Sequence, residues 1–135
     1  MRGFLALMIA ALAGLAAAQA KEGDYLYDTL KKPAYRRAFM SMLQGERRLP
    51  DWIAAMKGDG NHVDSPANIS DVNGTAHQFN HTCMAHDCGD NQMEVMFAPG
   101  GRKAWAVVVQ AGQPNRFFGA PNGEQRAALM REVNN

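Results

Sequence analysis

Residues 76–97 read AHQFNHTCMAHDCGDNQMEVMF, a stretch that holds both cysteines of the chain, Cys83 and Cys88. Segment 92–97 alternates polar and apolar residues, which is typical of a strand with one buried face. Segment 76–82 is the strand we expect to pair with it. Strands joined by a short turn must run antiparallel, because a parallel pair needs a long crossover. We therefore predict an antiparallel pair of strands connected by the loop CMAHDC, residues 83–88.

A helix is predicted on the N-terminal side of this pair. Pro33 suits the first turn of a helix, and Gly45 is a suitable end. Between them, apolar residues recur with the spacing of one helical face; they are Tyr35, Ala38, Phe39, Met42 and Leu43. The polar segment 21–30 before this helix is expected to be held only loosely.

A shorter helical unit should follow the break at Pro50. We expect Asp51 to cap a helical turn that runs through Met56, with Trp52 in the core. The dipeptide Asn73-Gly74 is a strong signal for a two-residue hairpin turn. The segment Gly58-Asp59-Gly60 ends the helical unit, and from there the pattern changes to strands.

The C-terminal part of the chain completes the predicted sheet. Segment 104–110 (AWAVVVQ) is strongly β-branched and apolar, so we expect it to be central, and 116–119 (RFFG) is a shorter strand. Good helix formers over 124–133 predict a closing helix. The fold class expected is α+β, with an antiparallel sheet of about five strands, flanking helices and a protruding loop.

The N-terminus indicates export. Residues 1–20 (MRGFLALMIAALAGLAAAQA) have the early positive charge, apolar run and small-x-small end of a secretory signal peptide. We expect residues 21–135 to form a single periplasmic domain, with no stable membrane insertion after cleavage. The chain has 14 Lys and Arg against 13 Asp and Glu residues. Loss of Arg2 balances them, which argues against a nucleic-acid partner.

Export also predicts that Cys83 and Cys88 are paired, because the compartment is oxidising. A bridge across so short a loop removes only about 2 kcal/mol of unfolded-chain entropy in the loop-closure model. A purely structural staple is therefore one hypothesis for the loop. Its effect would be mainly local, since it makes the connection between two strands rigid.

Metal binding and redox catalysis are two further hypotheses. His77, His81, Cys83, His86 and Cys88 are all metal-ligand types. Familiar zinc sites, however, take ligand pairs from separate segments, and an oxidised pair lacks thiolates. The C-x4-C spacing also differs from the C-x-x-C motif of thioredoxin-like proteins. No cofactor or resident metal is expected.

Recognition of a partner is the fourth hypothesis. A cyclised loop has already lost its conformational entropy, so more of its contact energy appears as affinity. The ring of His86 can donate through both nitrogens when protonated, which suits a pocket that contains carboxylates. Asp87 is expected either to orient this ring or to hold the loop backbone. The alternative is that His86 is an exposed histidine with no functional role.

An enzyme is not expected. No G-x-S-x-G motif supplies a nucleophile, and the carboxylates of Asp51, Asp90 and Glu94 are scattered along the chain. Adjacent His86 and Asp87 side chains point apart in an extended segment, so they do not form a catalytic pair.

The segments LPDWIAAMKG (49–58), CMAHDCG (83–89) and MEVMF (93–97) together resemble the Ivy family of periplasmic lysozyme inhibitors. In that family a Leu-Pro-x-Trp segment precedes a Cys-Lys-Pro-His-Asp-Cys-Gly loop, and a strand ending in Val-Met-aromatic follows it. The order and approximate spacing agree from about Asp28 to Phe97.

The resemblance implies a mechanism. The loop would enter the active-site cleft of a C-type lysozyme of a host, where His86 would bond the catalytic carboxylates and Asp87 would support the loop. It also implies a homodimer and, as further targets, the cell's own lytic transglycosylases. A module whose loop binds a metal ion or another protein is the alternative function.

Two loop residues depart from the family pattern. Met84 and Ala85 stand where the family has Lys and Pro. Without the proline the backbone is less restricted, and without the lysine association with an acidic cleft should be slower. We therefore expect Met84 and Ala85 to contact the target and to alter the rate of binding more than the fit.

Overall fold

The structure, a computed structural model, describes residues 22–58 and 60–135. The predicted signal peptide therefore lies outside the described residues. The helices are α1 (Leu26–Thr29), α2 (Pro33–Leu43), α3 (Asp51–Ala55), the 3-10 turn η1 (Pro99–Gly101) and α4 (Gly123–Val133). The strands are β1 (His62–Asp64), β2 (Asn68–Val72), β3 (Thr75–Met84), β4 (Asn91–Phe97), β5 (Ala104–Gln110) and β6 (Arg116–Phe118).

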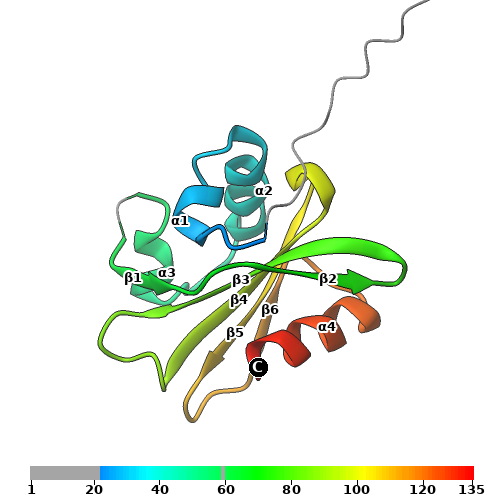
Figure 1. The fold of residues 1–135 in the computed structure, drawn as a ribbon. Helices are drawn as coiled ribbons and strands as arrows, with labels where there is room; N and C mark the ends of the chain where they lie inside the picture. Colours follow the sequence, from blue (N-terminus) through cyan, green and yellow to red (C-terminus); the bar gives the residue numbers. More distant parts are fainter. Residues whose placement is uncertain (1–21, 59) are drawn as a thin grey trace, which may run out of the picture.

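All strand pairs are antiparallel and belong to one sheet of six strands, ordered β1-β3-β4-β5-β6, with β2 also paired to β3 (Figure 1). The α+β prediction is confirmed, with six strands where about five were expected. The long strand β3 holds two short partners on one side. Its loop end pairs with β1, and its first half pairs with β2. The predicted central place of 104–110 is also confirmed, since β5 lies between β4 and β6.

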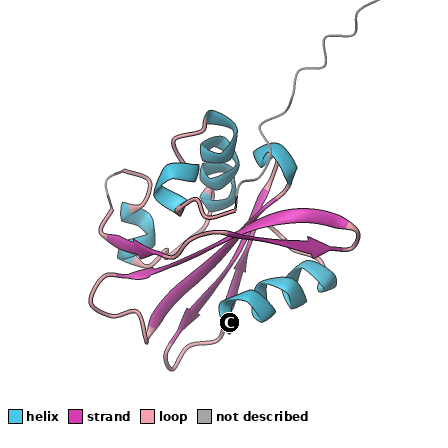
Figure 2. Cartoon of the chain, viewed as in Figure 1, coloured by secondary structure: helices cyan, strands magenta, loops and turns pink. Residues whose placement is uncertain are grey.

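Helices cover both faces of the sheet, as Figure 2 shows. On one face, the apolar sides of α1, α2 and α3 pack against alternate residues of β4 and β5, including Met93, Val95 and Phe97. On the other face, α4 packs Ala128 and Leu129 against a set that includes Met96. Neighbours along β4 therefore point to opposite layers, as the pleat of a strand requires. Among the described residues, no helix is long and apolar enough to cross a membrane.

The entry segment is held more firmly than predicted. Leu26 and Thr29 of α1 are fully buried. The Thr29 hydroxyl accepts a hydrogen bond of 2.8 Å from Gln78, and the Asp24 carbonyl accepts one of 3.0 Å from Asn80. The prediction of a loosely held segment was wrong because its partners are polar side chains of β3, which lie about fifty residues away in the chain.

Of two local predictions, the hairpin turn at Asn73-Gly74 is confirmed and the helix cap at Asp51 is wrong. Asn73 and Gly74 have φ values of 53° and 82°, as a type I′ hairpin turn requires, which confirms that prediction. Asp51 does not cap α3. Pro50 occupies the N-cap position and makes no side-chain hydrogen bond there, so Asp51 is the first helical residue. Helix α4 begins with a capping box that was not predicted, in which Asn122 and Gln125 each accept a hydrogen bond from the other's backbone N–H.

Candidate functional site

The loop between β3 and β4 is closed by a disulfide. Cys83 and Cys88 are joined, with their Cα atoms 4.9 Å apart, which confirms the predicted pairing. The strand β3 extends to Met84 and thus further than predicted, so Cys83 is itself a strand residue and is buried. It pairs with Gln92 of β4 and Val63 of β1. One end of the closed loop is therefore anchored inside the sheet.

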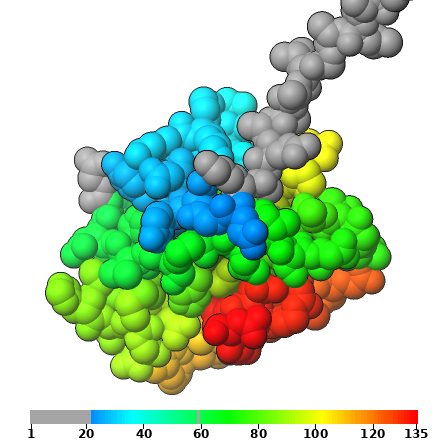
Figure 3. Space-filling model, in the orientation of Figure 1, coloured from blue at the N-terminus to red at the C-terminus, as the bar shows by residue number. Residues whose placement is uncertain are grey.

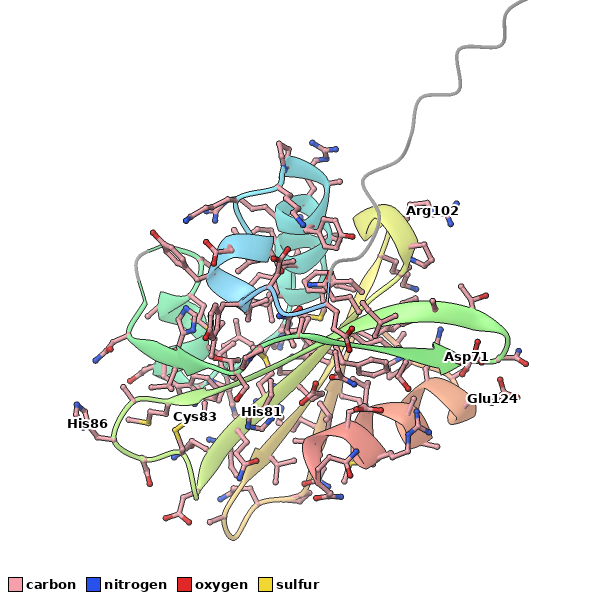
Figure 4. The ribbon with its side chains drawn as sticks, viewed as in Figure 1. Asp71, His81, Cys83, His86, Arg102 and Glu124 are labelled. Carbon is pink, nitrogen blue, oxygen red and sulfur yellow. A yellow bond between two sulfur atoms is a disulfide. The ribbon has the colours of Figure 1, made fainter. Side chains whose placement is uncertain are left out.

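A tight turn forms the tip of the loop. The Asp87 N–H donates to the Met84 carbonyl at 3.0 Å, and His86, at the third position of this turn, has φ of 67°. A positive φ at that position is the mark of a type II turn. Histidine tolerates this left-handed region better than most residues. The turn leaves the His86 side chain exposed, and Figure 4 shows it directed away from the sheet.

Asp87 ties the loop to the strand that leaves it. Its carboxylate accepts a hydrogen bond of 2.8 Å from the Asn91 side chain, and its carbonyl accepts the backbone N–H of Asn91 at 3.1 Å. Asn91 in turn accepts a bond of 3.1 Å from Gln110 of β5. Among the described residues, none of the hydrogen bonds joins Asp87 to the His86 ring. The Asp87 carboxylate thus bonds a side chain of β4, which differs from the side-chain-to-backbone bond that was expected, and its role in binding a target stays a prediction.

Met84 and Ala85 flank the exposed imidazole. Met84 is 36% exposed, although it is the last residue of β3, and Ala85 is half-buried. In Figure 3 the lime-coloured segment that contains this loop lies at the outer edge of the molecule. The tip therefore presents one imidazole beside one large apolar side chain, on a backbone restrained at both ends.

A histidine–aspartate pair supports the loop from β1. His62 Nδ1 lies 2.6 Å from Asp64 Oδ1, and the Tyr27 backbone N–H donates to Asp64 Oδ2 at 2.8 Å. Burial by itself would raise the pKa of Asp64. Hydrogen bonds from His62, Thr82 and Tyr27 outweigh it, and the pKa lies below the ordinary 3.8. Asp64 thus joins α1 to the sheet beneath the loop. This pair was not predicted, although the H-x-D spacing on one strand face is a usable signal.

A second histidine–carboxylate pair lies on the opposite face of β3. His81 Nδ1 is 3.0 Å from Glu94 Oε2, across the β3–β4 ladder. Glu94 is only 2% exposed, and this burial raises its pKa above the ordinary 4.5, aided by the negative charge of Glu132. The hydrogen bond and charge of His81 oppose this rise without cancelling it.

The structure does not assemble the metal-ligand types of the sequence. The disulfide consumes both thiolates, and His81 is paired with Glu94. His77 is buried beside Trp105 and bonds the Thr75 carbonyl at 2.8 Å. Within residues 22–58 and 60–135, no group of three or more His, Cys, Asp or Glu side chains is placed to hold a metal ion.

A rigid loop that carries an exposed imidazole on a sheet is suited to enter a concave surface of another molecule, because its shape is set before contact. The fold and site therefore define an α+β protein that carries one preformed, disulfide-closed loop on its sheet. Residues 34–133 match the family described as "Inhibitor of vertebrate lysozyme (Ivy)". The chain belongs to the Ivy family.

One named relative agrees with this assignment, and two uncharacterized proteins are also similar to the chain. A Pseudomonas aeruginosa protein named "Inhibitor of vertebrate lysozyme" is 30% identical over 144 residues, which covers 96% of this chain and 90% of that relative. An uncharacterized protein of the same species is 28% identical over 106 residues, or 77% of this chain and 66% of the relative. An uncharacterized protein of Yersinia pestis is 25% identical over 118 residues, or 78% and 74%.

Proposed function

We propose that this protein is a periplasmic inhibitor of C-type lysozyme that inserts the Cys83–Cys88 loop into the active-site cleft. The observation that carries the proposal is the position of His86, exposed at the tip of a loop that a disulfide closes. Family membership and the name of the P. aeruginosa relative support lysozyme as the target.

The chemistry of the target explains why one imidazole is enough. A retaining glycosidase uses two carboxyl groups about 5–5.5 Å apart, one as acid and one as nucleophile. A histidine ring has donors on opposite sides when protonated, so His86 can bond both groups at once. Both catalytic roles are then blocked, and the loop occupies the space that the sugar needs. The inhibitor itself performs no chemistry.

The restraints on the loop contribute to affinity. Binding a mobile loop would cost ordering entropy, whereas this one is restrained by the disulfide and by the bond from Asn91 to Asp87. Asp87 therefore acts by supporting the loop. Met84 and Ala85 contact the walls of the cleft, and Met84 is able to adapt to an apolar wall because its side chain is flexible.

The location follows from the N-terminal sequence. Residues 1–20 act as a signal peptide, and residues 21–135 form the exported inhibitor domain. An oxidising compartment agrees with the disulfide between Cys83 and Cys88.

Titration of a C-type lysozyme acting on bacterial cell walls tests the proposal. We expect one-to-one inhibition by the oxidised protein, and loss of at least about a hundredfold in His86→Ala, since the loop would lose its bonds to two charged groups. His86→Asn is the matched variant, because asparagine also tolerates the left-handed backbone at φ of 67° but lacks the imidazole. It should fail in the same way with an unchanged melting temperature.

Two results would contradict the mechanism. Full inhibition by both His86 variants would show that the ring does not occupy the catalytic site. Absence of inhibition by the wild type would exclude C-type lysozyme as the target, and the same titration on a lytic transglycosylase would then test the second target class.

A further inference from the structure

Met84 is the one exposed methionine in the described part of the chain, with 36% of its surface accessible. Of the other methionines in these segments, four are buried in the core and two pack against its edge. The buried ones are Met42, Met56, Met93 and Met96, and the packed ones are Met40 and Met130. A thioether reacts with a dissolved oxidant only where the oxidant can reach the sulfur, so Met84 should react first.

The cysteines of the chain do not compete with Met84 for an oxidant. Cys83 and Cys88 are joined in the disulfide, and the sequence holds no other cysteine. A free thiolate is ordinarily the first sulfur to be oxidised in a protein. Because both thiols are already consumed, the thioether of Met84 is the sulfur most open to oxidation.

The backbone of Met84 is fixed by contacts that do not involve its sulfur. Met84 is the register partner of His62 of β1, and its carbonyl accepts the Asp87 N–H at 3.0 Å. In Figure 4, Cys83 and His86, which flank Met84 in the chain, lie at the outer end of β3. A chemical change at the sulfur would therefore alter the surface beside His86 and leave the shape of the loop intact.

We propose that Met84 is a site of reversible oxidation to methionine sulfoxide by hydrogen peroxide, and that this oxidation weakens inhibition. The inference rests on the proposed function, because its effect requires Met84 to contact the enzyme. The sulfur lone pair attacks one peroxide oxygen, so the S–O bond forms as the O–O bond breaks. The sulfur loses two electrons to the peroxide. The departing hydroxide takes the proton from the transferred oxygen and leaves as water.

The sulfoxide changes the chemistry that the loop tip offers to its target. The thioether of Met84 is apolar and adapts to an apolar wall, whereas a sulfoxide is polar and chiral. Burial of its oxygen against an apolar wall, with no donor to pair it, opposes binding. The protein would thus inhibit strongly when peroxide is scarce and weakly when it is abundant. A methionine sulfoxide reductase would restore the inhibition.

Treatment of the disulfide-bonded protein with hydrogen peroxide tests the inference with two measurements. Peptide mass spectrometry should find the added oxygen at Met84 at least about tenfold faster than at Met40 or Met130, because those two pack against the core. The inhibition constant on a C-type lysozyme should rise about tenfold on treatment, as burial of an unpaired polar group predicts. Incubation with a methionine sulfoxide reductase should reverse the rise.

Two variants make the assignment specific. Met84→Leu removes the sulfur and keeps an apolar side chain of similar volume. Whatever its inhibition constant is before treatment, peroxide should leave that constant unchanged. Met130→Leu is the matched control, because it removes a sulfur from α4 and leaves the loop as it is. It should lose inhibition on treatment to the same extent as the wild type.

The outcomes separate the inference from the proposed function. Oxygen added first at another methionine, or added at Met84 with no change in the inhibition constant, would overturn the inference and leave the proposed function intact. A loss of inhibition in peroxide-treated Met84→Leu equal to that of the wild type would do the same. Absence of inhibition by the untreated wild type would overturn the proposed function and, with it, the effect assigned to Met84.

Discussion

The carboxylate of Asp87 accepts a hydrogen bond of 2.8 Å from the side-chain amide of Asn91, the first residue of β4. The disulfide holds the loop at the end of β3, and this bond holds it at the start of β4. Two independent restraints therefore act on a six-residue connection whose tip residue, His86, is exposed. Loop shape, and not only loop sequence, should determine binding.

Replacing Asp87 tests that inference. Asp87→Ala removes the bond to Asn91 but leaves the disulfide and His86 in place. We expect inhibition to weaken about tenfold, since a hydrogen bond to a charged group contributes about 1.5–3 kcal/mol. The inhibition constant on a C-type lysozyme is the measurement. Asp90→Ala is the control, because Asp90 is exposed and its removal should change little. Equal effects of the two variants would show that charge, and not the restraint, matters.

Removing the disulfide should separate function from stability. In a Cys83→Ser, Cys88→Ser double variant, we expect the free energy of unfolding to fall by about 2 kcal/mol. The fold should persist, because β3 and β4 remain paired from Gln78 to Cys83. Inhibition should fall by more than tenfold, since the loop must then be ordered on binding. Circular dichroism and the inhibition assay together check this. An unfolded variant would instead favour the staple hypothesis.

Glu94 should make the stability depend on pH in an unusual direction for a carboxylate. Its pKa is raised from 4.5 mainly by burial, so the folded state holds the proton more tightly than the unfolded state. The stability that this proton contributes is complete below the ordinary pKa and is lost as pH rises through the raised pKa. Glu94→Gln should therefore melt a few degrees above the wild type at neutral pH, and the difference should vanish in acid. A constant difference across pH would contradict this.

Asp64 should make the stability depend on pH in the opposite direction to Glu94. Burial alone would raise its pKa, but bonds from His62, Thr82 and Tyr27 lower it below 3.8. Its contribution to stability is present above the ordinary pKa and is lost as pH falls through the lowered one. Asp64→Asn should lower the free energy of unfolding by about 1–3 kcal/mol at neutral pH, because the donors that bond Asp64 lose a charged acceptor. The loss should become smaller as the pH falls. Urea unfolding measures this.

Asp28→Asn is the matched control for Asp64. Asp28 forms an ion pair of 2.8 Å with Lys31, but its side chain is 49% exposed. Exposed pairs contribute little, so this variant should change the free energy of unfolding by less than about 1 kcal/mol at any pH. An equal loss of unfolding free energy in the two variants would show that the buried contacts of Asp64 contribute no more than an exposed ion pair.

Much of the fold could be predicted from residues that lie close together in the sequence. The spacing of apolar residues predicted α2, whose apolar face from Tyr35 to Leu43 is buried. The dipeptide Asn73-Gly74 predicted its turn, and the β-branched run predicted β5. Each of these signals depends on residues a few positions apart. The same holds for the closed loop, because the chain has two cysteines only and a predicted signal peptide favours their pairing.

The supporting contacts of the site could not be read in this way. The Tyr27–Asp64 bond joins residues 37 positions apart, and the His81–Glu94 pair joins residues 13 apart across a ladder. No local periodicity records such pairs, because strand register and helix docking bring them together. Sequence alone thus specified a rigid loop that carries His86. Only packing in three dimensions buried Glu94 and paired it with His81, because burial depends on which distant segments cover a residue.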